Sequence, residues 1–169
     1  PSTIRVTEMP MPEPKQGQVR VKVAFAGINF ADLLMRLGFY QPRPPYPFTP
    51  GYEVSGTIDA LGEGESRFTI GQRVVAAMST GGQSSHVVVD IKRVLPLPEE
   101  ISLEAAAAMP VTYLTAHHML HHLGHLDENE SVLIHGGAGG VGTAALQLCQ
   151  WAGVSKVWAT ASGSKSNSV

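Results

Sequence analysis

The stretch SVLIHGGAGGVGTAALQLCQWAG, residues 131–153, passes from a short apolar run through glycines into apolar residues at helical spacing. It predicts a strand, a tight turn and a helix. Gly137, Gly139 and Gly142 give the spacing G-x-G-x-x-G, which allows a sharp turn, a close approach to a pyrophosphate and tight packing of the helix on the strand. The N-terminus of such a helix attracts phosphate. A dinucleotide site is therefore favoured over a merely flexible glycine loop.

The chain of 169 residues is long enough for one domain or two small ones. Its net charge of −2, without a dense Lys/Arg run, argues against nucleic acid or an anionic membrane surface as a partner. No apolar run is long enough for a transmembrane helix, and no signal-peptide pattern is seen. The single cysteine, Cys149, fits a buried core position in a reducing compartment. We expect a cytoplasmic protein.

Both ends of the sequence look cut. Ile4 and Val6 predict a strand at the very start, and the chain stops soon after the second strand of a βαβ unit. A doubly wound sheet needs several more parallel strands and helices. We therefore expect a fragment, or a chain whose remainder is not included.

The N-terminal part is predicted to be rich in strands. Residues Gln18–Ala26 alternate, with Val23 and Phe25 on the same buried face as the preceding valines. Further strands are expected at residues 52–60, 73–78 and 85–89, with glycine-rich turns between them, and these indicate a compact barrel or sandwich.

Two helical regions and a proline-rich loop are also predicted from capping residues and prolines. Asn29 is the expected N-cap of a short helix that ends at Gly38 and carries Asp32 in its first turn, with the leucines at 33, 34 and 37 inward. The proline-rich residues 40–50 must form a loop. Ser102 is expected to cap a helix over 103–108, and a second helix runs from Pro110 to residue 123. The expected domains are residues 1–111 and residues 112–169.

The residues after the second predicted strand of the βαβ unit favour NADP over NAD. NAD enzymes place an acid about 20 residues past the glycine turn, where it binds the ribose 2′-hydroxyl. This chain reads ATASGSK there, with Ser162, Ser164 and Lys165 and no acid. Hydroxyls and an ammonium stabilise a 2′-phosphate that a carboxylate would repel. The alternative is a solvated loop, and the serine-rich tail 162–168 would be disordered if nothing follows it.

Metal and nucleophile chemistry have less support. One cysteine cannot supply either zinc set of a zinc alcohol dehydrogenase. Several histidines lie one turn apart on a predicted helix, but no carboxylate lies between them to complete a metal site, so we expect none; these residues are His117, His118, His121, His122 and His125. No serine or cysteine shows a nucleophile motif. The chemistry is therefore expected to come from a cofactor, with polar groups aimed at the oxygen that becomes negative.

Five segments carry a family resemblance: AGINFADLLMRLGFY, PFTPGYEVSGTIDALGEG, AAAAMPVTYLTAHHML, VLIHGGAGGVGTAALQL and ATASGSK. In order and spacing they resemble the zinc-free quinone oxidoreductase group of the medium-chain dehydrogenase/reductase superfamily, most closely its vesicle amine transport protein branch. The resemblance implies a mixed α and β fold, a GroES-like β-barrel domain followed by the opening βαβ part of a truncated Rossmann fold. It also implies NADPH-dependent, zinc-independent reduction of quinones or α,β-unsaturated carbonyls in a cleft between the domains.

The resemblance also implies roles for particular residues. The substrate side would be formed by Asn29, Asp32, Tyr40 and Tyr52, and Tyr52 stands where zinc-dependent relatives have the histidine of G-H-E. The residues implied to contact the cofactor are Thr115 near the nicotinamide, Gly137, Ala138, Gly139, Gly140, Val141 and Gly142 along the pyrophosphate, and Ser162 and Lys165 at the 2′-phosphate.

The chain also departs from the family pattern. It lacks the rest of the Rossmann sheet and the return to the barrel, and Gln72 takes the place of the usual aspartate in the G-D-R-V turn. An intact relative would be a homodimer through Rossmann edge strands, which are not in this chain. Two alternatives stay open: a non-catalytic NADPH-binding protein on the same scaffold, and an inactive fragment.

Overall fold

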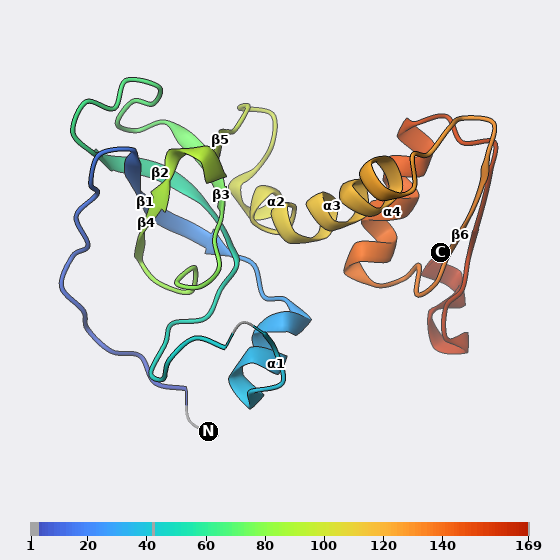
Figure 1. The fold of residues 1–169 in the computed structure, drawn as a ribbon, viewed down its shortest axis with the longest axis horizontal. Coiled ribbons are helices and arrows are strands. Elements are labelled where there is room, and N and C mark those ends of the chain that lie inside the picture. Colours follow the sequence, from blue (N-terminus) through green and yellow to red (C-terminus); the bar gives the residue numbers. More distant parts are fainter. Residues whose placement is uncertain (1–3, 42, 169) are drawn as a thin grey trace. The chain divides into compact units, whose positions relative to one another are not determined.

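The structure is a computed structural model that describes residues 4–41 and 43–168, with side chains through residue 165. The chain divides into two compact units, Pro1–Pro110 and Val111–Val169, each with its own core (Figure 1). No helix in the described part of the chain is long and apolar enough to cross a membrane.

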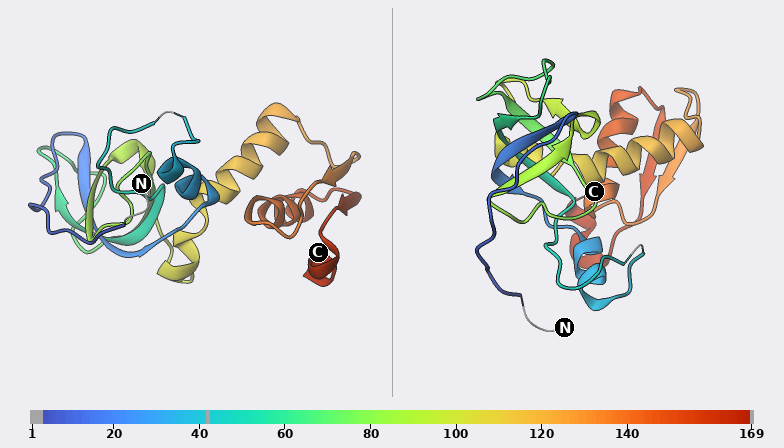
Figure 2. Two further views of the ribbon diagram at one scale, coloured as in Figure 1. Left: turned by 90° about the horizontal axis from the view of Figure 1, so that it is seen from below. Right: turned by 60° about the vertical axis from the view of Figure 1, so that its left-hand side comes forward.

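The first unit is built on a five-stranded antiparallel sheet, with the strand order β4-β1-β2-β3-β5. Its strands are β1 (Gln18–Ala26), β2 (Glu53–Leu61), β3 (Arg73–Ala77), β4 (His86–Asp90) and β5 (Val94–Pro96), with a 3₁₀ turn, η1 (Ile91–Arg93), before the last. Figure 2 shows that the sheet curls, as the predicted barrel requires. Inside the curl lie mainly small β-branched side chains, the valines of β1 to β5 together with Ile58 and Phe68.

Strand β1 has the predicted limits, but its last residues face differently from the prediction. The pairing of β1 with β2 shifts between Val23 and Phe25, which leaves Ala24 as an extra residue. Such a bulge reverses the alternation. Phe25 is therefore 44% exposed, and Ala26 packs against the core in its place.

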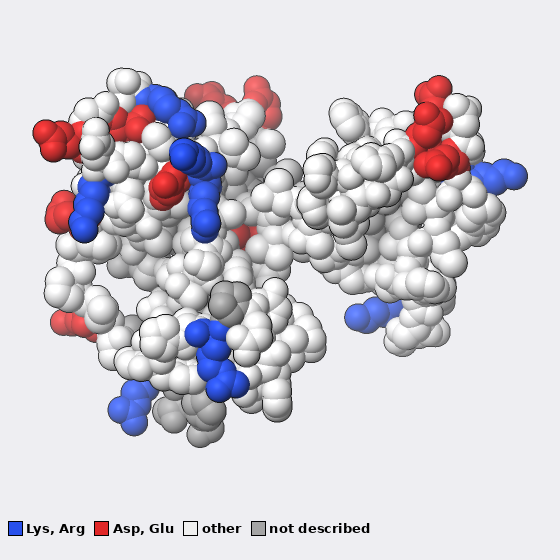
Figure 3. Space-filling model, in the orientation of Figure 1, with Lys and Arg blue, Asp and Glu red and all other residues white. Residues whose placement is uncertain are grey.

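Charged side chains tie together the three strands at one side of the sheet. Arg20 on β1 donates to Asp59 on β2 at 2.9 Å and to Glu13 at 3.1 Å, and His86 on β4 lies 3.4 Å from the other oxygen of Asp59. Figure 3 shows basic and acidic side chains interspersed on the drawn face of this unit. Arg20 is therefore engaged within the fold.

Helix α1 (Phe30–Leu37) begins after Asn29 and ends at Gly38, as predicted, with Gly38 in a left-handed conformation. Its buried side chains are Asp32 and Met35, whereas Leu33 and Leu37 are 45% and 50% exposed. The prediction that Leu33 and Leu37 point inward is therefore wrong, because the helix buries its capping carboxylate on the side that faces the protein, while Leu34 is half-buried.

The predicted N-terminal strand does not form, whereas the predicted helix after Ser102 does. Residues 4–15 form no regular structure, so the strand predicted around Ile4 and Val6 is wrong. Both side chains are well exposed, with no sheet edge to hold them. Helix α2 (Leu103–Ala107) forms as predicted, because the Ser102 hydroxyl accepts the backbone N–H of Ala105 at 3.1 Å.

The second unit contains the predicted strand, helix and strand. Strand β6 (Ser131–Ile134) pairs in parallel with β7 (Lys156–Ala159), and α4 (Gly140–Trp151) connects them. Helix α3 (Pro110–His117) precedes them and continues as a π-helix, η2 (His118–Leu123), where the Gly124 N–H bonds to the Met119 carbonyl five residues back. After β7 the chain forms the 3₁₀ helix η3 (Gly163–Ser168).

Candidate functional site

The glycine turn after β6 is pinned to the end of β7. The N–H of Gly137 donates to the Thr160 carbonyl at 2.9 Å, and the N–H of Gly136 lies 3.2 Å from the Thr160 hydroxyl. The N–H of Thr160 in turn donates to the Ile134 carbonyl at 2.9 Å. These bonds hold the turn against the end of the neighbouring strand, β7. The G-x-G-x-x-G spacing alone does not predict this attachment.

Three glycines in this turn have no room for a side chain or need a glycine conformation. The left-handed φ of +72° falls on Gly136. A Cβ on Gly142 would lie 2.7 Å from the Gly137 Cα and closer still to the Gly136 carbonyl oxygen, and one on Gly139 would lie 3.2 Å from that same oxygen. The third glycine of the motif therefore has its predicted role, close packing of α4 on the turn, while Gly136 makes the sharp bend.

The N-terminus of α4 has the features of an anion site. Gly139 is its N-cap and provides no side-chain cap, and the first helical bond runs from the Thr143 N–H to the Gly139 carbonyl at 2.8 Å. The backbone N–H groups at the start of the helix, in Gly140, Val141 and Gly142, therefore have no side-chain acceptor among the described contacts. Such groups, with the helix dipole, bind phosphate.

The other residues expected at the cofactor lie on two elements of the same unit. Ser162 and Lys165 are exposed, and the Lys165 N–H donates to the Ser162 carbonyl at 2.8 Å, so η3 begins soon after the Thr160 anchor. Thr115 is exposed on α3. The α3 residue that reaches the helix start is Thr112, whose methyl group lies 3.1 Å from the place of a Cβ on Gly140.

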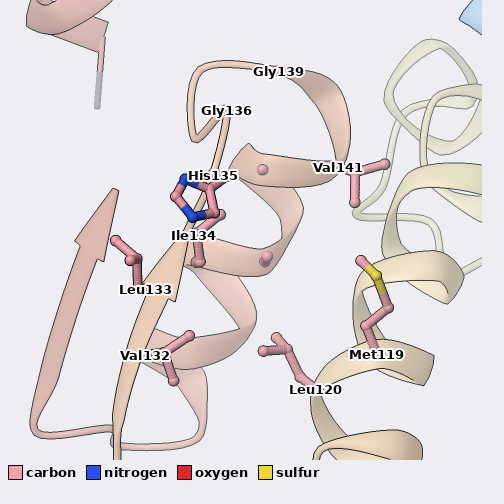
Figure 4. A pocket seen from close by; sticks show the side chains of 11 residues that line it. Met119, Leu120, Val132, Leu133, Ile134, His135, Gly136, Gly139 and Val141 are labelled. Carbon is pink, nitrogen blue, oxygen red and sulfur yellow. The ribbon is translucent and has the colours of Figure 1, made fainter. Parts of the chain in front are cut away.

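A cavity of about 440 Å³ opens beside the glycine turn. Figure 4 shows Met119 and Leu120 from η2 on one side and Val132 from β6 across from Leu120, with Val141 from α4 above Met119. Gly136, Gly139 and Gly142 form part of the wall. An apolar wall next to backbone N–H groups that have no side-chain acceptor is a combination that suits a nucleotide cofactor.

The first unit brings the predicted substrate-side residues together around a buried carboxylate. Asp32 is only 4% exposed. Its two oxygens accept the N–H groups of Asn29 and Gly51, each at 2.9 Å. Asp32 therefore joins the start of α1 to the backbone just before Tyr52.

Tyr52 contacts Tyr40 edge to face, with ring centroids 6.1 Å apart. The Tyr52 hydroxyl is buried and has no hydrogen-bond partner among the described residues. Burial, followed by the nearby Tyr40 and Asp32, raises the pKa of Tyr52 above the ordinary phenol value. The phenol is thus held protonated, as a donor without an acceptor.

Glu53, which the sequence reasoning did not select, lies next to this cluster. It is 2% exposed at the start of β2, and its Oε1 accepts the side-chain N–H of Asn29 at 2.7 Å. A Cβ on Gly27 would lie 2.6 Å from its Cγ and 2.7 Å from the Ala107 carbonyl. The sequence signal that could have pointed to Glu53 is a carboxylate near the start of a predicted strand whose following residues are apolar or small.

Four of the histidines of α3 and η2 form ring pairs. The ring centroids of His117 and His121 lie 4.8 Å apart, as do those of His118 and His122. Among the described residues, no three His, Cys, Asp or Glu side chains gather in a way that suits a metal ion.

The comparisons with known proteins agree with this arrangement. Residues 15–99 match the model of the alcohol dehydrogenase GroES-like domain. The synaptic vesicle membrane protein VAT-1 homolog of Danio rerio is 46% identical over 154 residues, which is 91% of this chain and 32% of that protein.

Two solved structures are also similar. The CurK enoyl reductase has a TM-score of 0.87 at 36% identity, and the quinone oxidoreductase of Thermus thermophilus, also solved as a complex with NADPH, has 0.80 at 37%. Each match covers 94% of this chain and 50% of the other. This chain thus spans about a third of the zebrafish relative and half of these enzymes.

The likeness to both enzymes thus extends over nearly the whole of this chain, including both of its units. The chain belongs to the alcohol dehydrogenase GroES-like domain family, in the quinone oxidoreductase and VAT-1 branch of the medium-chain dehydrogenase/reductase superfamily.

Proposed function

We propose that the protein from which these residues come is an NADPH-dependent reductase of quinones or α,β-unsaturated carbonyl compounds that works without zinc. The observation that carries the proposal is the buried Tyr52 hydroxyl, a protonated donor with no acceptor among the described residues. A buried donor without a partner is costly, which favours a site that a ligand oxygen completes.

The residues of the first unit would stabilise the oxygen of the substrate. As the carbonyl or quinone oxygen gains negative charge, a hydrogen bond from Tyr52 stabilises it, and the Asn29 amide is the second candidate donor. Each oxygen of Asp32 accepts one backbone N–H. We therefore assign Asp32 a positioning role and Tyr40 a packing role against the Tyr52 ring. The proton comes from Tyr52 or solvent.

The second unit would hold the cofactor. The start of α4 binds the pyrophosphate, and Ser162, Ser164 and Lys165 favour the 2′-phosphate of NADP, because hydroxyls and a cation follow β7 and no acid does. When bound, the nicotinamide supplies the hydride. The NADPH complex of the Thermus enzyme supports this choice. The names of that enzyme and of the CurK enoyl reductase support the two substrate classes.

Titration with NADPH and NADH, followed by nicotinamide fluorescence, tests the cofactor part on this chain and on the full-length natural protein. Because Lys165 carries the charge argument, Lys165→Ala should weaken NADPH binding and leave NADH binding nearly unchanged. A matched control is Lys22→Ala, an exposed lysine of β1 in the other unit.

Turnover on a panel of quinones and enones tests the reaction in the full-length natural protein. NADPH oxidation that depends on the panel compound is the expected result. NADPH binding without turnover would favour a non-catalytic binding protein. A preference for NADH would overturn the choice of NADP, and no cofactor binding by the full-length protein would overturn the proposal. Binding by the full-length protein alone would make this chain an inactive fragment.

A further inference from the structure

Buried Glu53 and half-buried Asn29 form a hydrogen-bonded pair beside Asp32 and Tyr52. The Asn29 Nδ2 lies 2.7 Å from the Glu53 Oε1, and Glu53 is 2% exposed. We propose that Glu53 is a positioning residue, a buried carboxylate that fixes the orientation of the Asn29 amide toward the substrate. This inference rests on the proposed function for its effect on turnover, but the geometry is testable separately.

The chemistry of the pair allows one orientation of the amide. The Asn29 Nδ2 donates to the Glu53 Oε1, so the amide nitrogen faces Glu53. One N–H is then committed to Glu53, and the second N–H and the carbonyl oxygen of Asn29 are left for a ligand. A bond to a charged acceptor is also stronger than a neutral one, so it holds the amide firmly.

The surrounding backbone leaves the Glu53 carboxylate little freedom to move. Gly27 crosses so close to it that a Cβ there would collide with the Glu53 side chain and with the carbonyl of Ala107 at the end of α2. The N–H of Gly27 donates to the backbone carbonyl of Glu53 at 3.2 Å. Glycine at position 27 is thus explained by the carboxylate that it covers.

The same short segments hold both candidate donors. Asn29 is clamped by its backbone N–H to Asp32 and by its side chain to Glu53, and Tyr52 directly precedes Glu53 in the chain. Asp32 therefore fixes where Asn29 is, and Glu53 fixes which way its amide points. A loss of Glu53 should affect catalysis through Asn29 and leave the cofactor unit unchanged.

The geometry is tested on this chain by NMR of the Asn29 side-chain amide. One amide proton should be shifted downfield by the carboxyl group, and Glu53→Gln, whose amide oxygen is a weaker acceptor, should reduce that shift. Glu13→Gln, a change at an exposed glutamate that pairs with Arg20, is the matched control and should leave the signal unchanged. An Asn29 signal that does not respond to Glu53→Gln overturns the pairing, whatever the activity.

The positioning role is tested by a mutant cycle in the full-length natural protein. Glu53→Gln should lower kcat about tenfold with NADPH affinity unchanged, and should have less than about a twofold effect once Asn29→Ala is present, because coupled residues are not additive. Additive losses would overturn a role through Asn29.

A swapped pair separates positioning from simple support of the fold. Asn29→Asp alone sets two acceptors against each other and should lower Tm. Adding Glu53→Gln restores a donor and an acceptor with the roles reversed, so Tm should recover while kcat stays low, since the amide at position 29 is gone. Recovery of both Tm and kcat would show a purely structural bond. If the NMR shift is found but no variant or wild type turns over, the proposed function fails and the pairing stands.

Discussion

Tyr52 and Tyr46 are two tyrosines of the same unit with opposite hydrogen-bond situations, so each serves as the control of the other. The Tyr46 hydroxyl donates to the carbonyls of Met35 and Arg36 at 3.3 and 3.1 Å, whereas the Tyr52 hydroxyl has no partner among the described residues. Removing an unpaired buried hydroxyl costs little stability, and removing a bonded one costs about 1 kcal/mol.

We expect Tyr52→Phe to leave the free energy of unfolding unchanged or to raise it, because an unpaired buried donor is removed. The same variant should lower kcat about 100-fold, the typical effect of losing one oxyanion donor. Tyr46→Phe should do the reverse, with a loss of about 1 kcal/mol and nearly normal turnover. Urea unfolding and steady-state kinetics on the full-length natural protein measure both. Full activity of Tyr52→Phe would remove Tyr52 from the mechanism.

Asp32→Asn should destabilise the first unit, because the new amide nitrogen cannot accept a backbone N–H that the lost oxygen accepted. The expected cost is about 1–3 kcal/mol. Asp127→Asn is the matched control, since Asp127 also accepts a backbone N–H, from Asn129, but on an exposed loop. Asp32→Asn should also lower the pKa of Tyr52, because the Asp32 charge contributes to raising it. An ultraviolet titration of the phenols would show this, and equal costs for the two variants would contradict the clamp.

For single residues, the sequence predicts which polar side chains belong to the candidate site better than it predicts their hydrogen-bond partners. Asn29, Asp32, Tyr40 and Tyr52 were selected, and the structure places them in one unit and joins them by contacts of Asp32 and Tyr52. Glu53 was missed because its role depends on Gly27 and α2, which only the folded chain brings to it. Their catalytic roles stay a prediction.

Among the elements, the glycine turn gives the sharpest prediction. Gly142→Ala should cost about 1–3 kcal/mol, because the added methyl group collides with backbone atoms that cannot rotate away. It should also weaken NADPH binding, since the start of α4 is pushed off the turn. Gly163→Ala, where a Cβ meets nothing within 4 Å, is the stability control and should stay within about 0.5 kcal/mol. Equal unfolding midpoints for the two variants would contradict the close packing.

Elements with strong local signals were predicted well. The limits of β1 follow from its alternation, and those of α1 from its capping residues. Strand β5 was missed because three residues carry no periodicity, and the π-helix was missed because apolar spacing cannot distinguish it from an α-helix. The bulge in β1 depends on its pairing with β2, so the exposure of Phe25 could not be read from β1 alone.

At the scale of the whole molecule, the order of a β-rich unit and a βαβ unit was predicted from periodicity together with the family resemblance. The two cores differ in kind. The fully buried side chains of the first unit are mainly β-branched and come from five strands. Those of the second unit are mainly alanines, with Ile134 and Cys149, and the larger apolar side chains packed against them are only partly buried. Incomplete burial of large apolar side chains gives less burial energy, so the second unit should be the less stable of the two.

Both tryptophans of the chain lie in the second unit, Trp151 at the end of α4 and Trp158 on β7. Their indole N–H resonances therefore report the unfolding of the unit that we propose to bind NADPH. At NADPH concentrations about 100 times Kd, this unit should gain about 2.7 kcal/mol, because the ligand binds only the folded form. The indole resonances of the folded state should thus persist to higher urea concentrations. The urea midpoint given by the backbone signals of β1 and β2 should rise less. Gly142→Ala should reduce the gain, and Tyr52→Phe should not. Equal gains in both sets of signals would contradict a cofactor site at the glycine turn. No gain in either set would mean that this chain does not bind NADPH by itself.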